Sequence, residues 1–285
     1  MLSVGIIGYG KLGTALAHAF VKLNSLKWII EKDKTKLQKC NIKNIQKDTS
    51  LDAINIFVDY IFIVVNDSNI RTIAKQLAEK FNHNLKNTTI IHCSGTFGLD
   101  ILSSCKPFAK NLASIHPYQT FYNPDKKLFK CAWTYNALKN FTEIENLIKS
   151  LGGIPFHLND IDKTLYHLSA VIASNITTLL LSSSKKILSK LNLPPDKFIT
   201  PIIKTTINNN IKSLQNQKEI PLTGPLARAD LKTITKQLKN LSVYPELLKE
   251  YKLLLLFAIE HLKNNNNINE SHYQELSQLL NQIDI

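Results

Sequence analysis

The feature that most constrains the fold of this chain is the segment SVGIIGYGKLGTALAHAF at residues 3–20. A short β-branched run precedes three glycines spaced G-x-G-x-x-G, and apolar residues with helical spacing follow them. The segment therefore predicts a strand, a tight turn and a helix, the arrangement of a dinucleotide-binding turn. In such a turn Gly8 permits the sharp bend, Gly10 lets the backbone approach a pyrophosphate, and Gly13 lets the helix pack closely on the strand.

The start of the predicted helix is the expected phosphate site. Unpaired backbone N–H groups and the helix macrodipole favour negative charge there, so Lys11 and Leu12 join the glycines as cofactor-binding residues. The alternative is a glycine-rich loop of another α/β protein that binds nothing.

Strand-like and helix-like segments alternate through the first half of the chain. A helical pattern covers residues 70–81, and apolar runs predict further strands at residues 26–30, 59–65, 88–92 and 112–115. Buried strands that alternate with helices predict a parallel sheet covered on both faces. The expected fold class is therefore α/β, with a doubly wound parallel Rossmann sheet at residues 1–158.

The second half of the chain lacks strand signals and reads as long helices. We expect a mostly α-helical second domain at residues 159–285, with helices at 163–191, 198–214, 230–238 and 244–262. The NNNN stretch at residues 264–267 predicts a solvated loop before a final helix.

Composition bears on the partners and the compartment. The 35 basic residues exceed the 22 acidic ones and give a net charge of +13, but they are scattered, so we expect no nucleic-acid partner and a positive field that attracts an anionic cofactor and an acidic substrate. The apolar run at residues 253–259 is too short to span a bilayer, so we expect no membrane association. No C-x-x-C pair or metal-ligand spacing with histidine occurs, which predicts a cytoplasmic protein without a bound metal and with four reduced thiols, Cys40, Cys93, Cys105 and Cys131.

Two charged residues after the second predicted strand bear on the choice of cofactor. An acidic residue at this strand end binds the ribose 2′-OH of NAD, whereas a basic side chain accommodates the 2′-phosphate of NADP. Glu31 occupies the acidic position and Lys32 the basic one. Because a lysine beside a flexible glutamate still pairs with a phosphate, we expect NADP(H) to be preferred, with NAD(H) as the alternative.

Segments spread along the chain resemble one two-domain family of Rossmann-like NADP oxidoreductases with a helical C-terminal domain, related to pyrroline-carboxylate reductase, 6-phosphogluconate dehydrogenase and the standard ketopantoate reductases. The resemblance extends to about residue 262. The resemblance implies that Val65 and Asp67 also bind the cofactor. One departure is Asn66 between them, where the family usually has proline beside the nicotinamide. The segments that carry the resemblance are GIIGYGKLGTALA, IVVNDSNI, IIHCSGTFGLDIL, ASIHPYQTF, LGGIPFHL, DKTLYHLSAVIASN and PLTGPLARAD.

The family includes an alternative type of ketopantoate reductase. The resemblance therefore implies NADPH-dependent reduction of a 2-oxoacid, 2-dehydropantoate to pantoate, in pantothenate and coenzyme A biosynthesis, with the active site between the domains. It also implies a homodimer through apolar helical faces such as YKLLLLFAIEHL. The alternatives are another carbonyl or imine reductase, a sugar-acid dehydrogenase, or, in a different class, a dinucleotide-binding regulator without turnover.

Candidates for the proton donor lie on the first helix of the second domain. Lys163 and His167 are four residues apart and share a helix face, and Asn175 lies two further four-residue steps along. Lys163, with a pKa lowered by burial near other positive charge, is the first choice for the proton donor, and His167 is the competing choice. The alternative is that Lys163 is a solvated surface lysine and His167 is a histidine of the core without a catalytic role.

Candidate substrate-binding residues come from both expected domains. Ser94, Gly95 and His116 follow predicted strands, where open α/β sheets bind ligands. In TGPLARAD, the planar guanidinium of Arg228 suits a substrate carboxylate, Thr223 offers a hydroxyl group, and Asp230 either joins the site or pairs with Arg228.

Overall fold

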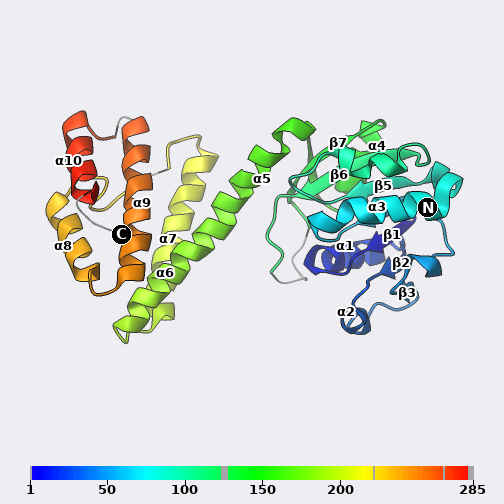
Figure 1. The fold of residues 1–285 in the computed structure, drawn as a ribbon, viewed down its shortest axis with the longest axis horizontal. Coiled ribbons are helices and arrows are strands. Elements are labelled where there is room, and N and C mark those ends of the chain that lie inside the picture. The colour runs from blue at the N-terminus through cyan, green and yellow to red at the C-terminus, as the bar shows by residue number, and fades with distance from the viewer. Residues whose placement is uncertain (1, 123–127, 221, 266, 282–285) are drawn as a thin grey trace. The chain divides into compact units, whose positions relative to one another are not determined.

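The computed structural model describes residues 2–122, 128–220, 222–265 and 267–281. The chain divides into two compact units, Met1–Asn175 and Ile176–Ile285. The first contains the sheet, and the second is built of helices (Figure 1).

The first unit is organised around an eight-stranded sheet with the order β3-β2-β1-β4-β5-β6-β7-β8. The strand order reverses between β1 and β4, which is the topological switch point of a doubly wound fold. The strands are β1 (Val4–Ile7), β2 (Leu26–Ile30), β3 (Gln46–Asp48), β4 (Tyr60–Ile63), β5 (Thr89–His92), β6 (Asn111–Pro117), β7 (Ala132–Ala137) and β8 (Ile154–His157).

Strands β1 to β6 are parallel, as expected, but β7 pairs antiparallel with β6 and β8 runs parallel to β7. The expectation of an all-parallel sheet is therefore wrong for its last two strands. Strand β3 was not expected either, because its sequence QKD is short and polar at the edge of the sheet.

Helices cover both faces of this sheet. Helices α1 (Lys11–Lys22) and α4 (Phe141–Ser150) pack on one face, and α3 (Asp67–Phe81) and the 3₁₀ segment Leu99–Cys105 pack on the other. A short helix, α2 (Lys34–Gln38), follows β2. The two apolar layers confirm the doubly wound architecture.

One continuous helical segment, Asp160–Lys190, runs from the first unit into the second. It comprises a 3₁₀ turn (Asp160–Asp162), α5 (Lys163–Val171), a π-helical stretch (Ile172–Ile176) and α6 (Thr177–Lys190). Its length and a hydropathy of 1.3 are sufficient for a membrane span by length and composition alone. Its first turns pack on the sheet, however, since Lys163 is buried and donates a hydrogen bond to Ser114 Oγ of β6.

The second unit consists of α6 with four further helices, α7 (Pro195–Gln215), α8 (Leu231–Leu241), α9 (Pro245–Asn264) and α10 (Glu270–Asn281). Its apolar core lies among α8, α9 and α10. Glu250 of α9 joins α6 by accepting hydrogen bonds from Ser183 Oγ (2.6 Å) and Lys186 Nζ (3.0 Å). The five helical segments expected after residue 160 are all present, with ends shifted by a few residues.

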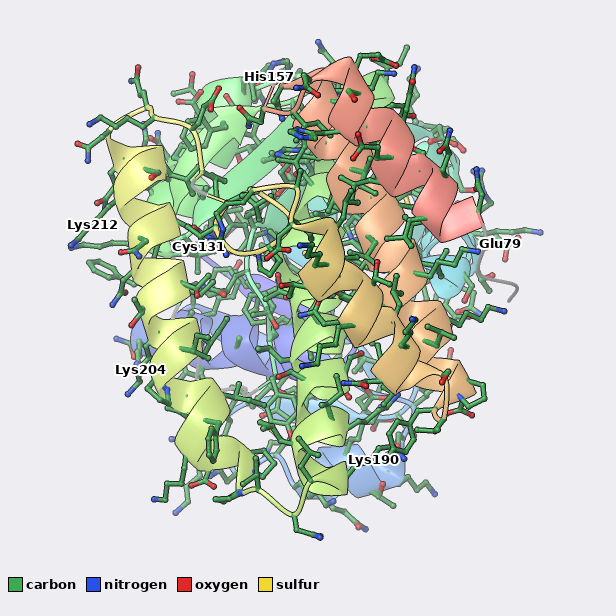
Figure 2. The ribbon with its side chains drawn as sticks, turned by 90° about the vertical axis from the view of Figure 1, so that its left-hand side faces the viewer. Glu79, Cys131, His157, Lys190, Lys204 and Lys212 are labelled. Atoms are coloured by element: carbon green, nitrogen blue, oxygen red, sulfur yellow. The ribbon has the colours of Figure 1, made fainter. Side chains whose placement is uncertain are left out.

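Helices α6 and α7 bury none of their side chains. Several of their large apolar residues are exposed, including Leu179 (61%) and Ile202 (66%). Figure 2 shows Lys204 and Lys212 projecting from the face of α7 that points away from α6. These two helices therefore carry much more exposed apolar surface than the core helices α8 and α10.

Candidate functional site

The glycine turn between β1 and α1 has the geometry that the sequence predicts. Gly8 has a φ of +102°, and a Cβ there would lie 2.3 Å from the carbonyl oxygen of Val64. A Cβ at Gly13 would lie 2.1 Å from the carbonyl oxygen of Gly8. A Cβ at Gly10 would meet nothing within 4 Å, so the backbone is open to a ligand at that residue. The turn therefore fits a dinucleotide pyrophosphate.

The N-terminus of α1 also suits a phosphate group. Gly10 is the N-cap and supplies no side chain to the first backbone N–H groups, and the first turn contains no acidic residue. These N–H groups and the macrodipole favour an anion. Lys11 is exposed beside them, with its Nζ 4.9 Å from the centre of the Tyr122 ring.

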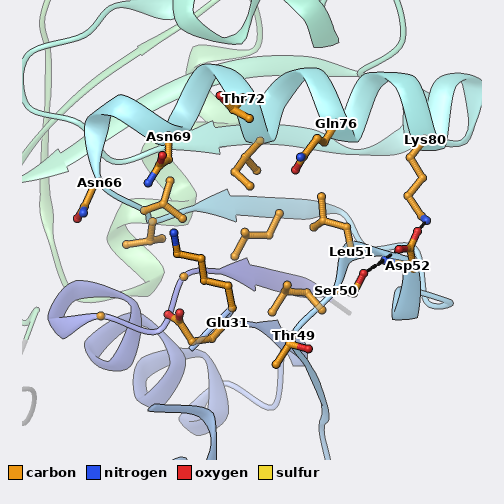
Figure 3. Close-up of a pocket in the computed structure, with 18 of the residues that line it drawn as sticks. Glu31, Thr49, Ser50, Leu51, Asp52, Asn66, Asn69, Thr72, Gln76 and Lys80 are labelled. Carbon is orange, nitrogen blue, oxygen red and sulfur yellow. Dashed lines mark hydrogen bonds and ion pairs between the residues drawn. The ribbon is translucent and has the colours of Figure 1, made fainter. Parts of the chain in front are cut away.

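A cavity of about 780 Å³ opens at the switch point between β1 and β4 (Figure 3). Five of the expected cofactor residues line it: Gly8, Gly10, Glu31, Lys32 and Val65. The lining does not include four others, Lys11, Leu12, Gly13 and Asp67. The position of the cavity at a switch point is the usual one for a ligand in an open α/β sheet.

Glu31 is held by the backbone at the end of β2. Its Oε2 accepts a hydrogen bond from the Tyr9 N–H (2.7 Å) and its Oε1 accepts one from the Asp33 N–H (3.0 Å). The residue is only 7% exposed. The expectation of a flexible glutamate is therefore wrong, because its carboxylate stabilises the glycine turn itself.

Positive charge lines the cavity near this fixed carboxylate. Lys32 and Lys36 are exposed and belong to its lining, and Lys36 forms a long ion pair of 4.0 Å with Asp33. A second basic residue at this end is what a 2′-phosphate requires beyond a ribose hydroxyl group. The sequence reading missed Lys36, although it lies four residues after Lys32.

Polar side chains from α3 and from the segment after β3 form the rest of the cavity rim. Figure 3 shows Asn69, Thr72 and Gln76 along one side of α3. At the far end, Lys80 forms an ion pair with Asp52, whose Oδ2 accepts a hydrogen bond from Ser50 Oγ (2.8 Å). The sequence reading missed these residues, although the helical spacing of those on α3 is a recognisable signal.

A second group of candidate side chains lies at the carboxyl ends of β5 and β6, where α5 begins. Lys163 is 3% exposed and bonds to Ser114 of β6. Burial lowers its pKa to about 8, while Asp160, Cys93 and Asp67 act in the opposite direction. The expected lowering of this pKa by burial is present. The expected contribution of positive charge is not, because the neighbours that act on the amine are acidic groups that raise its pKa.

His116 lies beside Lys163 at the end of β6. Its Nδ1 is 2.9 Å from the Tyr166 hydroxyl, and its ring is 5.7 Å from the ring of His167. Burial, with the positive charges of His167 and Lys163, lowers the pKa of His116 to about 3, so its imidazole is neutral at pH 7. Lys163 and His167 thus face the same strand end, as their four-residue spacing predicts.

The loop after β5 fits tightly against this group. A Cβ at Gly95 would lie 2.4 Å from the His167 ring and 2.9 Å from Nε2 of His116. Ser94 Oγ donates a hydrogen bond to Asp67 Oδ2 (2.8 Å) and accepts two, from the backbone N–H groups of residues 96 and 97 (3.1 Å each). The hydroxyl of Ser94 is therefore used within the protein, and the two histidine rings occupy the space where a side chain at residue 95 would lie.

His92 is a buried residue that the sequence reading missed. Its Nδ1 accepts a hydrogen bond from the Ser94 N–H (3.2 Å), so its Nε2–H donates to the Gly98 carbonyl (3.1 Å). Burial lowers its pKa to about 3, and the charge of Lys163 contributes in the same direction. A neutral His92 therefore fixes both ends of the loop that contains Gly95.

The other candidates lie away from this group or in the second unit. Asn175 is exposed in the π-helical stretch. In the second unit, Thr223 and Arg228 are exposed, and Asp230 caps α8 by accepting hydrogen bonds from the Thr233 N–H (3.1 Å) and hydroxyl (2.7 Å). Hydrogen bonds with Thr233 are the main cause of the lowered pKa of Asp230, and Arg228 contributes less.

Two family models match the sequence in succession. A Rossmann-like domain matches residues 1–117, and a domain described as a domain of unknown function, DUF2520, matches residues 136–256. The matches place a Rossmann-like domain before a DUF2520 domain in this chain. None of the curated proteins matches the sequence.

Solved structures of this two-domain Rossmann-like architecture are similar over nearly the whole chain. A Bacteroides fragilis protein, proposed to be an NADP oxidoreductase, has a TM-score of 0.74 and 20% sequence identity. The similarity covers 89% of this chain and 96% of the Bacteroides fragilis chain. A protein of Thermotoga maritima has a TM-score of 0.67 and 21% identity and covers 92% and 99%. The 1-pyrroline-5-carboxylate reductase of Streptococcus pyogenes has a TM-score of 0.58 and 16% identity and covers 87% and 95%.

Proposed function

We propose that this protein is an NADPH-dependent reductase of a 2-oxoacid, with 2-dehydropantoate as the substrate to test first. The observation that carries the proposal is the buried Lys163 amine at the end of β6, in the same unit as an open glycine turn. An amine whose pKa is lowered to about 8 exchanges protons near neutral pH, which suits a general acid. The comparison with a Bacteroides fragilis protein proposed to be an NADP oxidoreductase supports the reaction class.

NADPH is the preferred cofactor in this proposal. Glu31 is occupied by two backbone N–H groups, whereas Lys32 and Lys36 line the cavity. A structural relative, the Plasmodium falciparum pyrroline carboxylate reductase, was solved with NADP bound. Replacing both lysines by alanine is expected to weaken NADPH binding at least tenfold and to leave NADH binding nearly unchanged, because the two ammonium groups would pair with the 2′-phosphate, which NADH lacks. Equal losses for both cofactors in calorimetric titrations would contradict this assignment.

The side chains around Lys163 perform the remaining chemistry. Bound NADPH supplies a hydride to the substrate carbonyl carbon. Lys163 Nζ donates a proton to the carbonyl oxygen, and the bond to Ser114 fixes the direction of the amine. The neutral His116, with Tyr166, orients the substrate, while His167 is the competing proton donor. Arg228, an exposed guanidinium, is the proposed partner of the substrate carboxylate.

Reduction of an imine is the second candidate function. Reductive aminase and imine reductase of Aspergillus terreus, both solved with NADPH or a related cofactor, have the same fold with TM-scores of 0.59 and 0.55. The same lysine and histidine groups would serve a C=N bond. An imine substrate without a carboxylate would not require Arg228, so this residue distinguishes the two candidates.

The decisive experiment follows NADPH consumption by the purified protein with 2-dehydropantoate, other 2-oxoacids and cyclic imines. Reduction of 2-oxoacids that falls at least a hundredfold in Lys163→Ala, and whose KM rises in Arg228→Ala, supports the proposal. Lys232→Ala, an exposed lysine of α8, is the control. Reduction of imines alone would favour the second candidate. Tight NADPH binding without reduction of either class would refute an enzymatic function for these substrates.

We also infer that a second copy of this chain covers the apolar faces of α6 and α7. These helices bury no side chain of their own, and exposed apolar areas of this kind mark protein interfaces. Light scattering after gel filtration should give the mass of a dimer, and Leu179→Glu should give a monomer while Lys232→Glu does not. A monomeric wild-type protein would overturn this inference, and recovery in the membrane fraction would show that lipid covers the same helices.

A further inference from the structure

Asp160 is an acidic residue at the start of the long helical segment. Its side chain connects three parts of the first unit. Its Oδ2 accepts a hydrogen bond from the Leu99 N–H (2.8 Å), beyond the loop that follows β5. Its Oδ1 accepts one from Nδ2 of Asn136 on β7 (2.9 Å). Both carboxylate oxygens are therefore used to hold the loop and the strand against the turn that begins the helix.

The contact between Asp160 and the loop is so close that it leaves no room for a side chain at Gly98. A Cβ at Gly98 would lie 2.5 Å from Asp160 Oδ2. The carbonyl of Gly98 accepts the hydrogen bond from His92, so the loop is fixed from the sheet on one side and from the helix on the other. The same loop contains Gly95, which contacts His116 and His167.

Asp160 also acts on Lys163, one helical turn further along the chain. Of the acidic groups around this amine, Asp160 raises its pKa most, and Cys93 and Asp67 follow. The basic groups around it are His167 on the same helix face and His92 and His116 on the sheet. His92 and His116 are neutral at pH 7 because their pKa values are lowered to about 3. Asp160 is thus the acidic group that most opposes the effect of burial on this lysine.

We propose that Asp160 is a positioning residue, which holds the loop at residues 94–99 and strand β7 against the turn that begins the long helix, and so sets the surroundings of the Lys163 amine. The hold of Asp160 on the loop concerns the protein alone, whereas its effect on catalytic turnover rests on the proposed function. Asp162 provides a matched control, because it is an acidic residue of the same turn that is exposed and makes no capping hydrogen bond.

The first measurement is the pKa of Lys163 in the protein without substrate, obtained by NMR titration of the lysine side chains. The signal of Lys163 is identified as the one that is missing in Lys163→Arg. Asp160→Asn should lower this pKa by about one unit, because it removes a nearby opposite charge. Asp162→Asn should leave it unchanged. Asn136→Ala, which removes a hydrogen bond and keeps the charge, should loosen the loop in hydrogen exchange and leave the pKa near its original value.

The second measurement is the pH dependence of reduction. Since the protonated amine is the acid, the rate falls as the pH rises through its pKa, and Asp160→Asn should move this decline to lower pH by the same amount. An unchanged Lys163 pKa in Asp160→Asn would overturn the proposal, as would a decline that does not move. A shifted pKa in a protein that reduces no substrate would support the electrostatic role of Asp160 and refute the proposed function. If Asp160→Asn does not fold, Asp160→Glu must restore folding and the original pKa.

Discussion

At the scale of single residues, the three glycines of the first turn have separate roles. Gly13 is required by packing, because a Cβ would collide with the carbonyl oxygen of Gly8. Gly10 has open space around it, so its lack of a side chain is not needed by the protein itself. A ligand at the start of α1 explains an unobstructed position there.

This difference gives a prediction for two alanine substitutions. Gly13→Ala should lower the melting temperature by several degrees, since the backbone of Gly8 has to move and a strained contact of this kind costs about 1–3 kcal/mol. Gly10→Ala should melt like the wild type and bind NADPH at least tenfold more weakly. Thermal unfolding and calorimetric titration of both variants measure these effects. Normal NADPH binding by Gly10→Ala would contradict the placement of the pyrophosphate.

At the scale of secondary structure elements, apolar periodicity predicted most of the fold. It gave β1, β2, β4, β5 and β6, which are buried and apolar, and the long helices after residue 160. It missed β3, β7 and β8. Strand β8 exposes Ile154 and Phe156 at the sheet edge, and β7 alternates buried and accessible residues, so neither has the continuous apolar run of a central parallel strand.

The candidate site was less predictable than the elements that carry it. The ends of successive parallel strands meet at one edge, so Gly95 and His116 were predictable neighbours. The partners that fix them were not, because Asp160, Asn136 and Leu99 meet only through the tertiary fold. The fixed position of Glu31 likewise depends on a hydrogen bond to the backbone of Tyr9, which no side-chain pattern reveals.

Helix α8 offers a prediction at this scale. Asp230 is its N-cap and bonds to both the backbone and the hydroxyl of Thr233. Asp230→Ala should destabilise the second unit by about 1 kcal/mol, the usual cost of losing a cap, and Asp230→Ser should restore most of it. Chemical denaturation of the three proteins measures the difference. If both variants retain wild-type stability but lose activity, Asp230 serves the substrate and its capping contributes little.

At the scale of the whole molecule, stability in acid should depend on two histidines, the buried His92 and the partly buried His116. His92 and His116 have pKa values of about 3 in the folded protein, mainly because of burial, against an ordinary value of 6.5. Between these values the unfolded chain binds protons that the folded chain does not. The stability of the folded state is therefore complete above pH 6.5 and declines as the pH falls toward 3.

The expected slope is about 1.4 kcal/mol per pH unit for each histidine, from the free energy of one pKa unit. The net charge of +13 at pH 7 adds repulsion as carboxylates become protonated, so wild-type protein should unfold cooperatively before pH 3 is reached. His92→Asn keeps an acceptor for the Ser94 N–H and binds no proton, so denaturation curves between pH 4 and 6.5 should show a shallower slope. His272→Asn, at an exposed position, should retain the wild-type slope. Equal slopes for all three proteins would mean that His92 has an ordinary pKa in the folded protein. The proposed role of a neutral His92 imidazole in fixing the loop after β5 would then be wrong.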